Sequence, residues 1–224
     1  MFKRRRVSVI IPCLNEQDAI REVLQRVPDY IDEVIVVDNN SSDGTAEAAR
    51  SCGATVVRED IRGYGRAYKK GFALATGDII VTLDGDHSYP VDAVSYLLEA
   101  FDHLHAQFLS ASRLPAEGTE AMPFKHYVGN RVLSLVMSAL FLHWVEDSQS
   151  GMWVFARKAL EKMKLESDGM AFSEEIKAEA IRRREIGFRE IPILYSSRIG
   201  RKKLRPWRDG WSNLVFLFKK RFLG

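Results

Sequence analysis

This sequence has few cysteines, no long apolar run and no strong excess of positive or negative charge. Its only two cysteines, Cys13 and Cys52, have no metal-ligand spacing and provide no disulfide framework. The longest uncharged apolar segment, 132–145, is shorter than the roughly 20 residues that cross a bilayer. The N-terminal apolar run is too short for a signal peptide. We therefore expect an intracellular, cytoplasmic protein without a transmembrane helix.

Two common nucleotide-binding motifs are also missing. No Gly-x-Gly-x-x-Gly follows the first predicted strand and no Walker-type lysine loop is present, so a dinucleotide-binding fold and a P-loop enzyme are poorly supported. The segment 63–66 lacks a third glycine and is interpreted as a flexible turn before a basic helix. The 33 basic and 30 acidic residues nearly balance, and no nucleic-acid-binding motif is found. We therefore expect no nucleic-acid partner.

The composition, with 46% hydrophobic and 28% charged residues, is that of one globular domain with a core of ordinary size. Short β-branched runs alternate with amphipathic stretches, an order that is typical of βα units in a parallel sheet. The predicted fold class is α/β, with a mixed, mainly parallel sheet flanked by helices. The predicted strands are 7–11, 34–37, 55–57, 79–83, 153–156 and 188–193, and the predicted helices are 16–27, 45–52, 66–75, 123–141 and 173–184.

Two acidic side chains follow the fourth predicted strand. Asp84 and Asp86 are two residues apart, so on an extended chain their carboxylates point to the same side and can share one cation. Gly85 between them allows another group to approach the backbone closely. Such oxygen ligands select Mg²⁺ or Mn²⁺, which stabilise a leaving diphosphate as Lewis acids. The alternative is a pair of solvated turn carboxylates, but the position at a strand end favours the metal site.

Another acidic residue, Asp38, ends a second predicted strand and leads into the polar loop 39–45. A carboxylate in this position can accept hydrogen bonds from a ribose or a base. For Ser42 and Asp43 in the same loop, we favour a helix-capping role. Ligands of open α/β sheets bind outside the carboxyl ends of the strands, so Asp38 and the acid pair are expected at one site.

Together these motifs resemble the family 2 glycosyltransferases with a GT-A fold, and above all the dolichyl- or polyprenyl-phosphate mannose and glucose synthases. The resemblance runs almost from end to end, and the ordered set is specific although each piece is common. It is carried by Val9-Ile10-Ile11-Pro12 with Asn15-Glu16, Asp38 with Ser41, Asp43-Gly44-Thr45, Gly65, Ala67, Gly77-Asp78, Asp84-Gly85-Asp86 with Ser88 and Pro90, Ser112-Arg113, Asn130-Arg131, Asp147 with Ser150-Gly151, Phe172, Glu175, Ile191-Pro192-Ile193, Arg198, Gly200 and Lys203-Leu204.

The resemblance implies an inverting transfer of a hexose from a UDP- or GDP-linked sugar to a polyprenyl or dolichyl phosphate, dependent on Mg²⁺ or Mn²⁺. It also implies a role for particular residues. The implied catalytic residues are Asp86, Arg113, Arg131 and Asp147; the nucleotide-sugar site comprises Pro12, Asn15, Glu16, Asp38, Asn39, Asp84, Gly85 and Asp86; the acceptor-phosphate site comprises Arg113, Arg131, Arg198 and Lys203; and the metal ligands are Asp84, Asp86 and Ser88.

The sequence departs from this pattern at two positions. Asn39 stands where relatives commonly have a second aspartate, which leaves the identity of the base open. Lys202 replaces a frequent serine before Lys203 and adds charge beside the implied phosphate site.

A phosphate acceptor removes the need for a general base. Its second pKa is near 6, so the attacking oxygen is largely ionised at pH 7. The basic residues would then position the anions and relieve their mutual repulsion. If the acceptor were instead a hydroxyl, Asp147 would serve as the base. Each arginine could also form a surface ion pair, and for Arg131 the two interpretations are evenly balanced.

Residues 207–224 are expected to form a basic amphipathic helix that follows a transferase domain of residues 1–206. Basic residues are dense in 198–208 and recur at 219–221. Such a helix is typical of a membrane surface, although a helix docked on the core is almost as well supported. We favour peripheral attachment to the cytoplasmic face of a membrane, with room for a separate membrane-protein partner. The apolar stripe consists of Trp207, Trp211, Leu214, Val215, Phe218 and Phe222.

Two other functions remain open. A family 2 transferase that acts on a carbohydrate or small-molecule hydroxyl would turn over simple acceptors with Asp147 as base. A catalytically silent nucleotide- or membrane-binding module would show no metal-dependent turnover, and the intact pair Asp84 and Asp86 argues against it.

Overall fold

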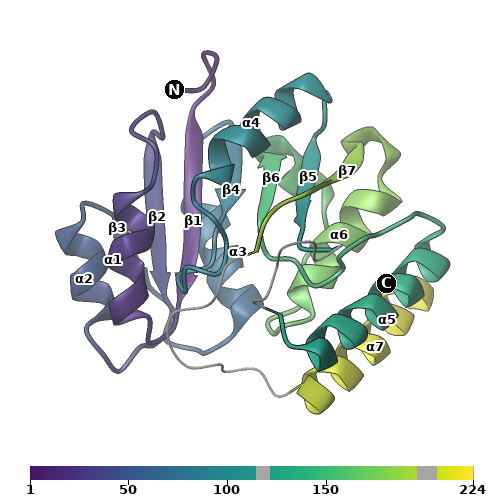
Figure 1. The fold of residues 1–224 in the computed structure, drawn as a ribbon. Coiled ribbons are helices and arrows are strands. Elements are labelled where there is room, and N and C mark those ends of the chain that lie inside the picture. Colours follow the sequence, from purple (N-terminus) through teal and green to yellow (C-terminus); the bar gives the residue numbers. More distant parts are fainter. Residues whose placement is uncertain (115–121, 196–205, 224) are drawn as a thin grey trace.

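The computed structural model describes residues 1–114, 122–195 and 206–223, and of residues 206–209 only the backbone. The described strands form one sheet with helices on both faces (Figure 1), which confirms the expected fold class. The strands are β1 (Val7–Cys13), β2 (Glu33–Asp38), β3 (Thr55–Arg58), β4 (Ile79–Thr82), β5 (Phe108–Ser112), β6 (Trp153–Ala156) and β7 (Phe188–Pro192). The helices are α1 (Gln17–Gln25), α2 (Thr45–Ser51), α3 (Tyr64–Leu74), α4 (Ala93–His103), α5 (Phe124–Phe141), α6 (Phe172–Arg182) and α7 (Pro206–Phe222), with short 3₁₀ helices at Arg157–Lys162 and Arg184–Ile186.

The strand order is β3-β2-β1-β4-β6-β5-β7. β1 pairs in parallel with both β2 and β4, whereas β6 runs antiparallel to β4 and β5. The chain thus leaves β1 towards one edge and returns to β4 on the other side of β1. Open α/β sheets bind ligands where the strand order reverses in this way, at the carboxyl ends of the strands, which here are the ends of β1 and β4.

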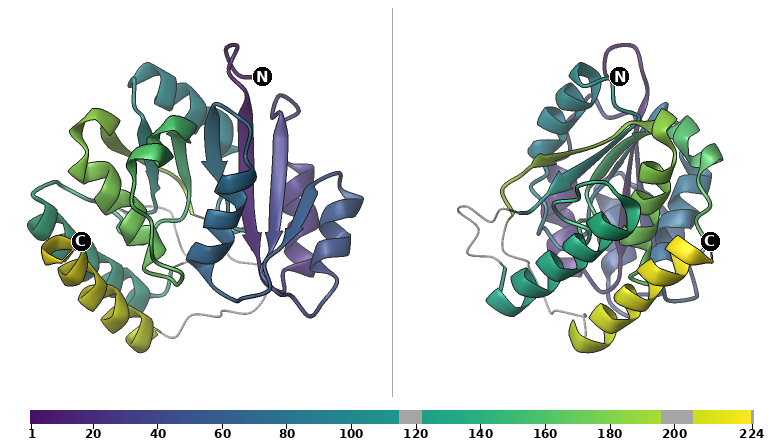
Figure 2. Two further views of the ribbon diagram at one scale, coloured as in Figure 1. Left: turned by 180° about the vertical axis from the view of Figure 1, so that it is seen from behind. Right: turned by 90° about the vertical axis from the view of Figure 1, so that its right-hand side faces the viewer.

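Both faces of the sheet are covered because its strands are apolar on both sides. The residues of β1 from Val7 to Ile11 are buried without the alternation of a one-sided strand, as expected for a central parallel strand. One core cluster joins the sheet to α1, α2 and α4, and another joins it to α3 and α6. A third cluster lies between α5, α6 and α7, and the two views of Figure 2 show α5 and α7 side by side at one edge.

Every strand and helix expected from the sequence is present, within two residues of its expected ends. Two further elements, α4 and β5, were not predicted. β5 has the sequence Phe-Leu-Ser-Ala-Ser, whose small and hydroxylated residues carry little β-propensity of their own. It is a strand because β6 and β7 pair with it on both sides. No helix in the described part of the chain is long and apolar enough to cross a membrane.

Candidate active site

The polar loop after β2 and the acid pair after β4 meet at the end of β1. The carbonyl of Cys13 accepts the N–H of Asn39, 2.8 Å away, which holds the end of β2 against β1. On the other side, a Cβ at Gly85 would overlap the Sγ of Cys13. The close approach that we expected at Gly85 is therefore made by the protein's own thiol. Cys13 brings the candidate nucleotide loop and the acid pair into one site.

Asn39 anchors a neighbouring loop with its whole amide group. Its Nδ2 donates to the carbonyls of Glu59 (3.3 Å) and Ile61 (2.9 Å), and its Oδ1 accepts the N–H of Gly63 at 2.7 Å. An aspartate could not donate to the two carbonyls. The asparagine at this position thus suits the backbone of 59–63, and its amide is engaged by the protein itself.

Asp38, Asn15 and Glu16 are joined to the loop that follows β2. Asp38 is buried, and its Oδ1 accepts the N–H of Ser41 at 3.1 Å. Asn15 Oδ1 accepts the N–H of Ser42 at 2.8 Å, and the N–H of Glu16 donates to Thr45 Oγ1 at 2.9 Å. Pro12 is half-buried in β1 beside them. These residues share one end of the sheet, as the sequence predicted, and their polar groups shape the loop around it.

Asp84 lies beside two tyrosines that the sequence did not single out, the half-buried Tyr64 and the buried Tyr68. The hydroxyls of Tyr64 and Tyr68 each donate to Asp84 Oδ1 at a distance of 3.4 Å. Burial, with the nearby carboxylate, raises the pKa of both phenols well above the ordinary value, so both remain protonated donors. A Cβ at Gly151 would lie 3.5 Å from Asp84 Oδ1, which places the loop before β6 directly against this carboxylate.

Asp86 and Ser88 form a tight turn. Asp86 Oδ1 accepts both the N–H of Ser88 (2.9 Å) and its hydroxyl (2.5 Å), and both residues are buried. Among the described residues, no cluster of three or more His, Cys, Asp or Glu side chains could hold a metal ion. A cation at Asp84 and Asp86 would thus need further oxygens from a diphosphate or water, which is how proteins commonly bind Mg²⁺.

Arg113 and Asp147 form a buried pair between β5 and the loop before β6. Arg113 Nε and Nη2 donate to the two carboxylate oxygens of Asp147 at 2.7 and 2.9 Å, and its backbone N–H adds a third bond of 3.1 Å. Burial alone would raise the pKa of Asp147, but the Arg113 guanidinium lowers it to about 2. The carboxylate is therefore ionised at neutral pH and a poor proton acceptor.

Tyr89 connects this pair to the acid pair. Its hydroxyl oxygen accepts the N–H of Gly151 at 2.7 Å, and its ring centroid lies 6.0 Å from the Arg113 guanidinium. The ring of Tyr195 lies 5.2 Å from the same guanidinium. The two ring centroids are 5.4 Å apart, so Arg113 lies beside an aromatic pair, a placement that suits a buried guanidinium. The chain of contacts from Asp84 through Gly151 and Tyr89 to Arg113 makes one continuous site.

Arg131 of α5 is half-exposed and pairs with Glu146, the residue before Asp147, at 2.9 Å. This is the ion-pair interpretation that the sequence left open, and it places Arg131 beside the Asp147 loop. Arg198 and Lys203 lie outside the described residues.

Three charged residues around the same loop, two of them fully buried, were not predicted from the sequence. Glu174 and Lys177 are fully buried in α6, and Glu190 of β7 is half-buried. The sequence of α6, with its many charges, is typical of a solvent-exposed helix, so the pattern carried no signal of burial.

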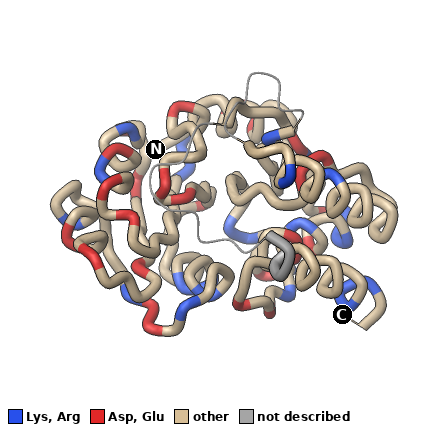
Figure 3. The backbone as a smooth tube through the Cα atoms, turned by 60° about the horizontal axis from the view of Figure 1, so that its bottom comes forward, with Lys and Arg blue, Asp and Glu red and all other residues tan. Residues whose placement is uncertain are grey.

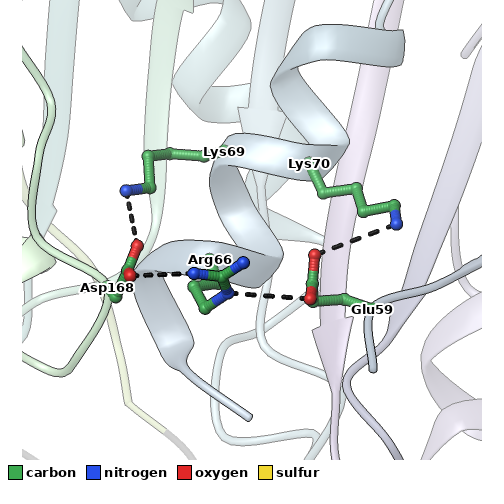
Figure 4. A pocket seen from close by; sticks show the side chains of 5 residues that line it. All are labelled: Glu59, Arg66, Lys69, Lys70 and Asp168. Carbon is green, nitrogen blue, oxygen red and sulfur yellow. Dashed lines mark hydrogen bonds and ion pairs between the residues drawn. The ribbon is translucent and has the colours of Figure 1, made fainter. Parts of the chain in front are cut away.

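The basic helix expected after Gly65 is α3. Its positive charges are neutralised by ion pairs that line a hollow on the protein surface (Figure 4). Asp168 pairs with Arg66 (3.0 Å) and Lys69 (2.6 Å), and Glu59 lies 3.8 Å from Lys70. These pairs join α3 to the segments that flank it. Basic and acidic residues are likewise interspersed over the rest of the backbone (Figure 3).

A mixed α/β sheet with an acid pair at the end of β4, beside a polar loop after β2, is the arrangement of a GT-A glycosyltransferase. The crystal structure of glucosyl-3-phosphoglycerate synthase from Mycobacterium tuberculosis matches this fold with a TM-score of 0.79, at 21% identity, over 99% of this chain and 82% of that one. That enzyme has also been crystallised with UDP, Mn²⁺ and phosphoglyceric acid. At this identity the likeness concerns the fold alone.

The family model for glycosyl transferase family 2 matches residues 8–164, and the chain belongs to that family of glycosyltransferases. It is 33% identical to the low-salt glycan biosynthesis hexosyltransferase Agl6 of Haloferax volcanii, over 94% of this chain and 52% of that protein. The dolichyl-phosphate hexose transferase of the same organism is 30% identical, with 91% and 89% covered. The dolichol-phosphate mannosyltransferase of Pyrococcus furiosus is 26% identical, with 89% and 59% covered. The chain thus spans about half the length of Agl6 and most of the hexose transferase.

Proposed function

We propose that this chain transfers a hexose from a nucleoside-diphosphate sugar to a polyprenyl or dolichyl phosphate at a membrane surface. The observation that carries the proposal is the pairing of Asp147 with Arg113. With a pKa of about 2, Asp147 cannot remove a proton from a hydroxyl at neutral pH. A phosphate acceptor brings its own ionised oxygen, because its second pKa is near 6. The relatives named for dolichyl-phosphate transfer agree with such an acceptor.

In the proposed reaction, a phosphate oxygen attacks the anomeric carbon while the bond from that carbon to the nucleoside diphosphate breaks, with inversion. Asp38 and the loop after β2 would hold the nucleoside, in line with their place at the end of the sheet. Arg113 would face the acceptor phosphate with the Nη1 group that takes no part in the Asp147 pair. The remaining basic residues would reduce the repulsion between the anions.

Asp84 and Asp86 would hold Mg²⁺ or Mn²⁺ with the donor diphosphate, because two carboxylates at one strand end are the hard oxygen ligands these ions prefer. When bound, the ion would act as a Lewis acid that stabilises the leaving diphosphate. The hydroxyl of Ser88 donates to Asp86, so in this arrangement Ser88 orients a ligand carboxylate.

Two adjacent helices support contact with a membrane. On α7, Asn213, Leu217 and Lys220 are buried against the core, and this leaves Trp211, Phe218 and Phe222 exposed. The predicted apolar stripe is thus divided: these three aromatic residues face outwards, whereas Leu214 and Val215 are half-buried and Leu214 packs against the third core cluster. Lys220, expected among the membrane-facing charges, is instead buried in ion pairs with Glu175 and Glu179.

Helix α5 repeats the pattern beside α7. Phe124, Val128, Val132 and Leu135 are exposed at spacings of three and four residues, while Leu133 and Met137 are buried on its other side. Two neighbouring helices with outward apolar stripes are suited to the interfacial region of a bilayer, where Trp and Phe insert. The exposed Lys219 and Arg221 would add attraction to an anionic leaflet.

A nucleotide-release assay tests the transferase proposal. Wild type is incubated with UDP- and GDP-sugars, Mn²⁺ or Mg²⁺, and either polyprenyl phosphate, phosphoglyceric acid or a simple sugar. We expect release only with polyprenyl phosphate, and a loss of about 100-fold or more for Asp86→Asn, which keeps the Oδ1 that Ser88 needs but lacks the charge. The exposed Asp60→Asn is the control and should match wild type.

Equal turnover of a hydroxyl acceptor would favour the rival transferase, and no metal-dependent release with any donor would favour the silent module.

Liposome flotation tests the membrane proposal. A variant with Trp211→Ser, Phe218→Ser and Phe222→Ser should lose most of its binding to anionic vesicles, because it lacks the exposed aromatic side chains of α7. The docked side of α7 is untouched, so the helix should stay in place. The matched control carries Ile61→Ser, Leu74→Ser and Tyr96→Ser, three exposed apolar residues elsewhere on the surface. Equal flotation of the two variants would refute the membrane-contact proposal.

A further inference from the structure

The backbone of the loop before β6 is held by side chains rather than by a strand partner. At its centre, the Lys177 ammonium donates to the carbonyls of Asp147 (2.6 Å) and Ser150 (3.0 Å). Lys177 is fully buried in α6, and both of these acceptors belong to the segment that carries the Asp147 carboxylate. One buried cation thus fixes the two ends of a four-residue turn.

Other elements hold the remaining groups of the same turn. The Glu190 carboxylate accepts the N–H groups of Glu146 (2.7 Å) and Asp147 (3.3 Å), and Ser134 Oγ accepts the N–H of Ser148 at 2.9 Å. The carbonyl of Gly151 accepts the hydroxyls of Thr82 (2.8 Å) and Tyr68 (3.3 Å). Lys177 is the only one of these groups that bears a positive charge.

We propose that Lys177 is a positioning residue for the acceptor phosphate. By fixing the turn 147–150 it sets the direction of the Asp147 carboxylate, which in turn holds the Arg113 guanidinium through two hydrogen bonds. This inference rests on the proposed function, since it takes Arg113 to be the group that meets the acceptor. Lys177 acts through Asp147 and Arg113 and does not itself touch a substrate.

The chemistry of the site explains why a lysine occupies this position. A buried ammonium is costly unless its donors are satisfied, and here two carbonyls accept from it. Burial lowers the pKa of Lys177, while the nearby Asp147 and Glu190 carboxylates raise it. These two carboxylates thus partly compensate the charge of the ammonium group. A neutral side chain of the same length would leave the two carbonyls without this donor and Asp147 with only Arg113 as a counter-charge.

The chain contains a matched control in Lys220. This lysine is also buried and also contacts α6, where it reaches Glu175 and Glu179 at 3.1 Å and donates to the carbonyl of Lys164 at 2.8 Å. None of these partners belongs to the turn 147–150. Lys177→Met and Lys220→Met thus remove comparable buried charges from the two sides of one helix.

The test combines kinetics with hydrogen exchange on the purified full chain. For Lys177→Met we expect the KM for polyprenyl phosphate to rise about tenfold and kcat to fall, while the KM for the donor stays within about twofold. Backbone amides of 146–151 should exchange faster. Lys220→Met should leave the loop amides and the acceptor KM unchanged, even if it lowers stability equally. Equal kinetic effects of the two variants, or unchanged loop exchange in Lys177→Met, would overturn the inference.

A milder variant covers the case in which Lys177→Met does not fold. Ser134→Ala removes the hydroxyl that accepts the Ser148 N–H and donates to Ser148 Oγ, and it should move the acceptor KM and the loop exchange in the same direction by a smaller factor. An unchanged acceptor KM in Ser134→Ala, with faster loop exchange, would overturn the link between loop order and acceptor binding. If wild type does not use polyprenyl phosphate, the proposed function fails, whereas the exchange data still decide whether Lys177 orders the loop.

Discussion

The Sγ of Cys13 occupies the space in which a side chain at residue 85 would begin. Cys13 ends β1, and Gly85 lies between the two acids that follow β4, so this contact sets how closely the acid pair approaches the nucleotide loop. The glycine is therefore required by its neighbour on the adjacent strand, which is a steric demand of the protein and independent of any ligand.

Gly85→Ala should lower the free energy of unfolding by about 1–3 kcal/mol, because the added methyl group overlaps Cys13 in a tightly packed strand end. Cys13→Ala, which removes the sulfur, should restore most of this loss in the double variant. Urea denaturation of the four proteins measures the coupling between the two positions. Additive effects would show that the strain at residue 85 arises elsewhere.

Asn39→Asp should destabilise the protein by about 1–3 kcal/mol, because two backbone carbonyls lose their amide donor and a second carboxylate appears beside Asp38. The control is Asn40→Asp, since Asn40 donates to one carbonyl, that of Asp60, at an exposed site where water can replace it. Thermal unfolding of both variants provides the comparison. Equal melting temperatures would mean that the amide of residue 39 does not hold the segment 59–63.

Asp147→Asn should reduce the free energy of unfolding at pH 7 by about 3–5 kcal/mol, because Arg113 is left as a buried charge without its partner. The pKa of Asp147 is depressed to about 2 in the folded protein, below the ordinary 3.8, so its contribution is complete above pH 4 and is lost as the pH falls towards 2. Urea denaturation at pH 7 and near pH 3 should therefore show a smaller difference between variant and wild type at the lower pH. A difference that does not change with pH would contradict the depressed pKa.

Glu174→Gln should stabilise the protein at pH 8 and have little effect near pH 4.5. Burial raises the pKa of Glu174 to about 8, although Gln149 and Lys177 act in the opposite direction. Between the ordinary value of 4.5 and about 8, the folded state keeps a proton that the unfolded state has released, so wild-type stability falls as the pH rises. Glutamine retains the oxygen that accepts from Gln149.

The gain from Glu174→Gln should appear as a rise of a few degrees in melting temperature at pH 8, since about 1 kcal/mol corresponds to 2–4 °C in a protein of this size. The exposed Glu185→Gln is the control and should show no such pH-dependent gain. A constant offset between Glu174→Gln and wild type from pH 5 to pH 8 would contradict the raised pKa.

The sequence by itself determined the order of strands and helices and the place of the acidic residues. Val7 to Ile11 and 79–83 are apolar runs that end in polar groups, and such runs are typical of parallel strands buried on both faces. The position of Asp38, Asp84 and Asp86 at strand ends follows directly from this local pattern. β5 does not follow from its own sequence, because its small residues form a strand only when β6 and β7 flank it.

Only the tertiary structure decided which charged residues are buried and what they hold. Three lysines in helices show this. Lys177 binds the Asp147 turn, Lys219 is exposed, and Lys220 pairs with Glu175 and Glu179. Helical periodicity assigns a residue to a face, but the environment of that face depends on which distant segment packs there. The same reason separates Asn39 from Asn40: both donate to carbonyls 20–22 residues further along the chain, but only Asn39 is buried there.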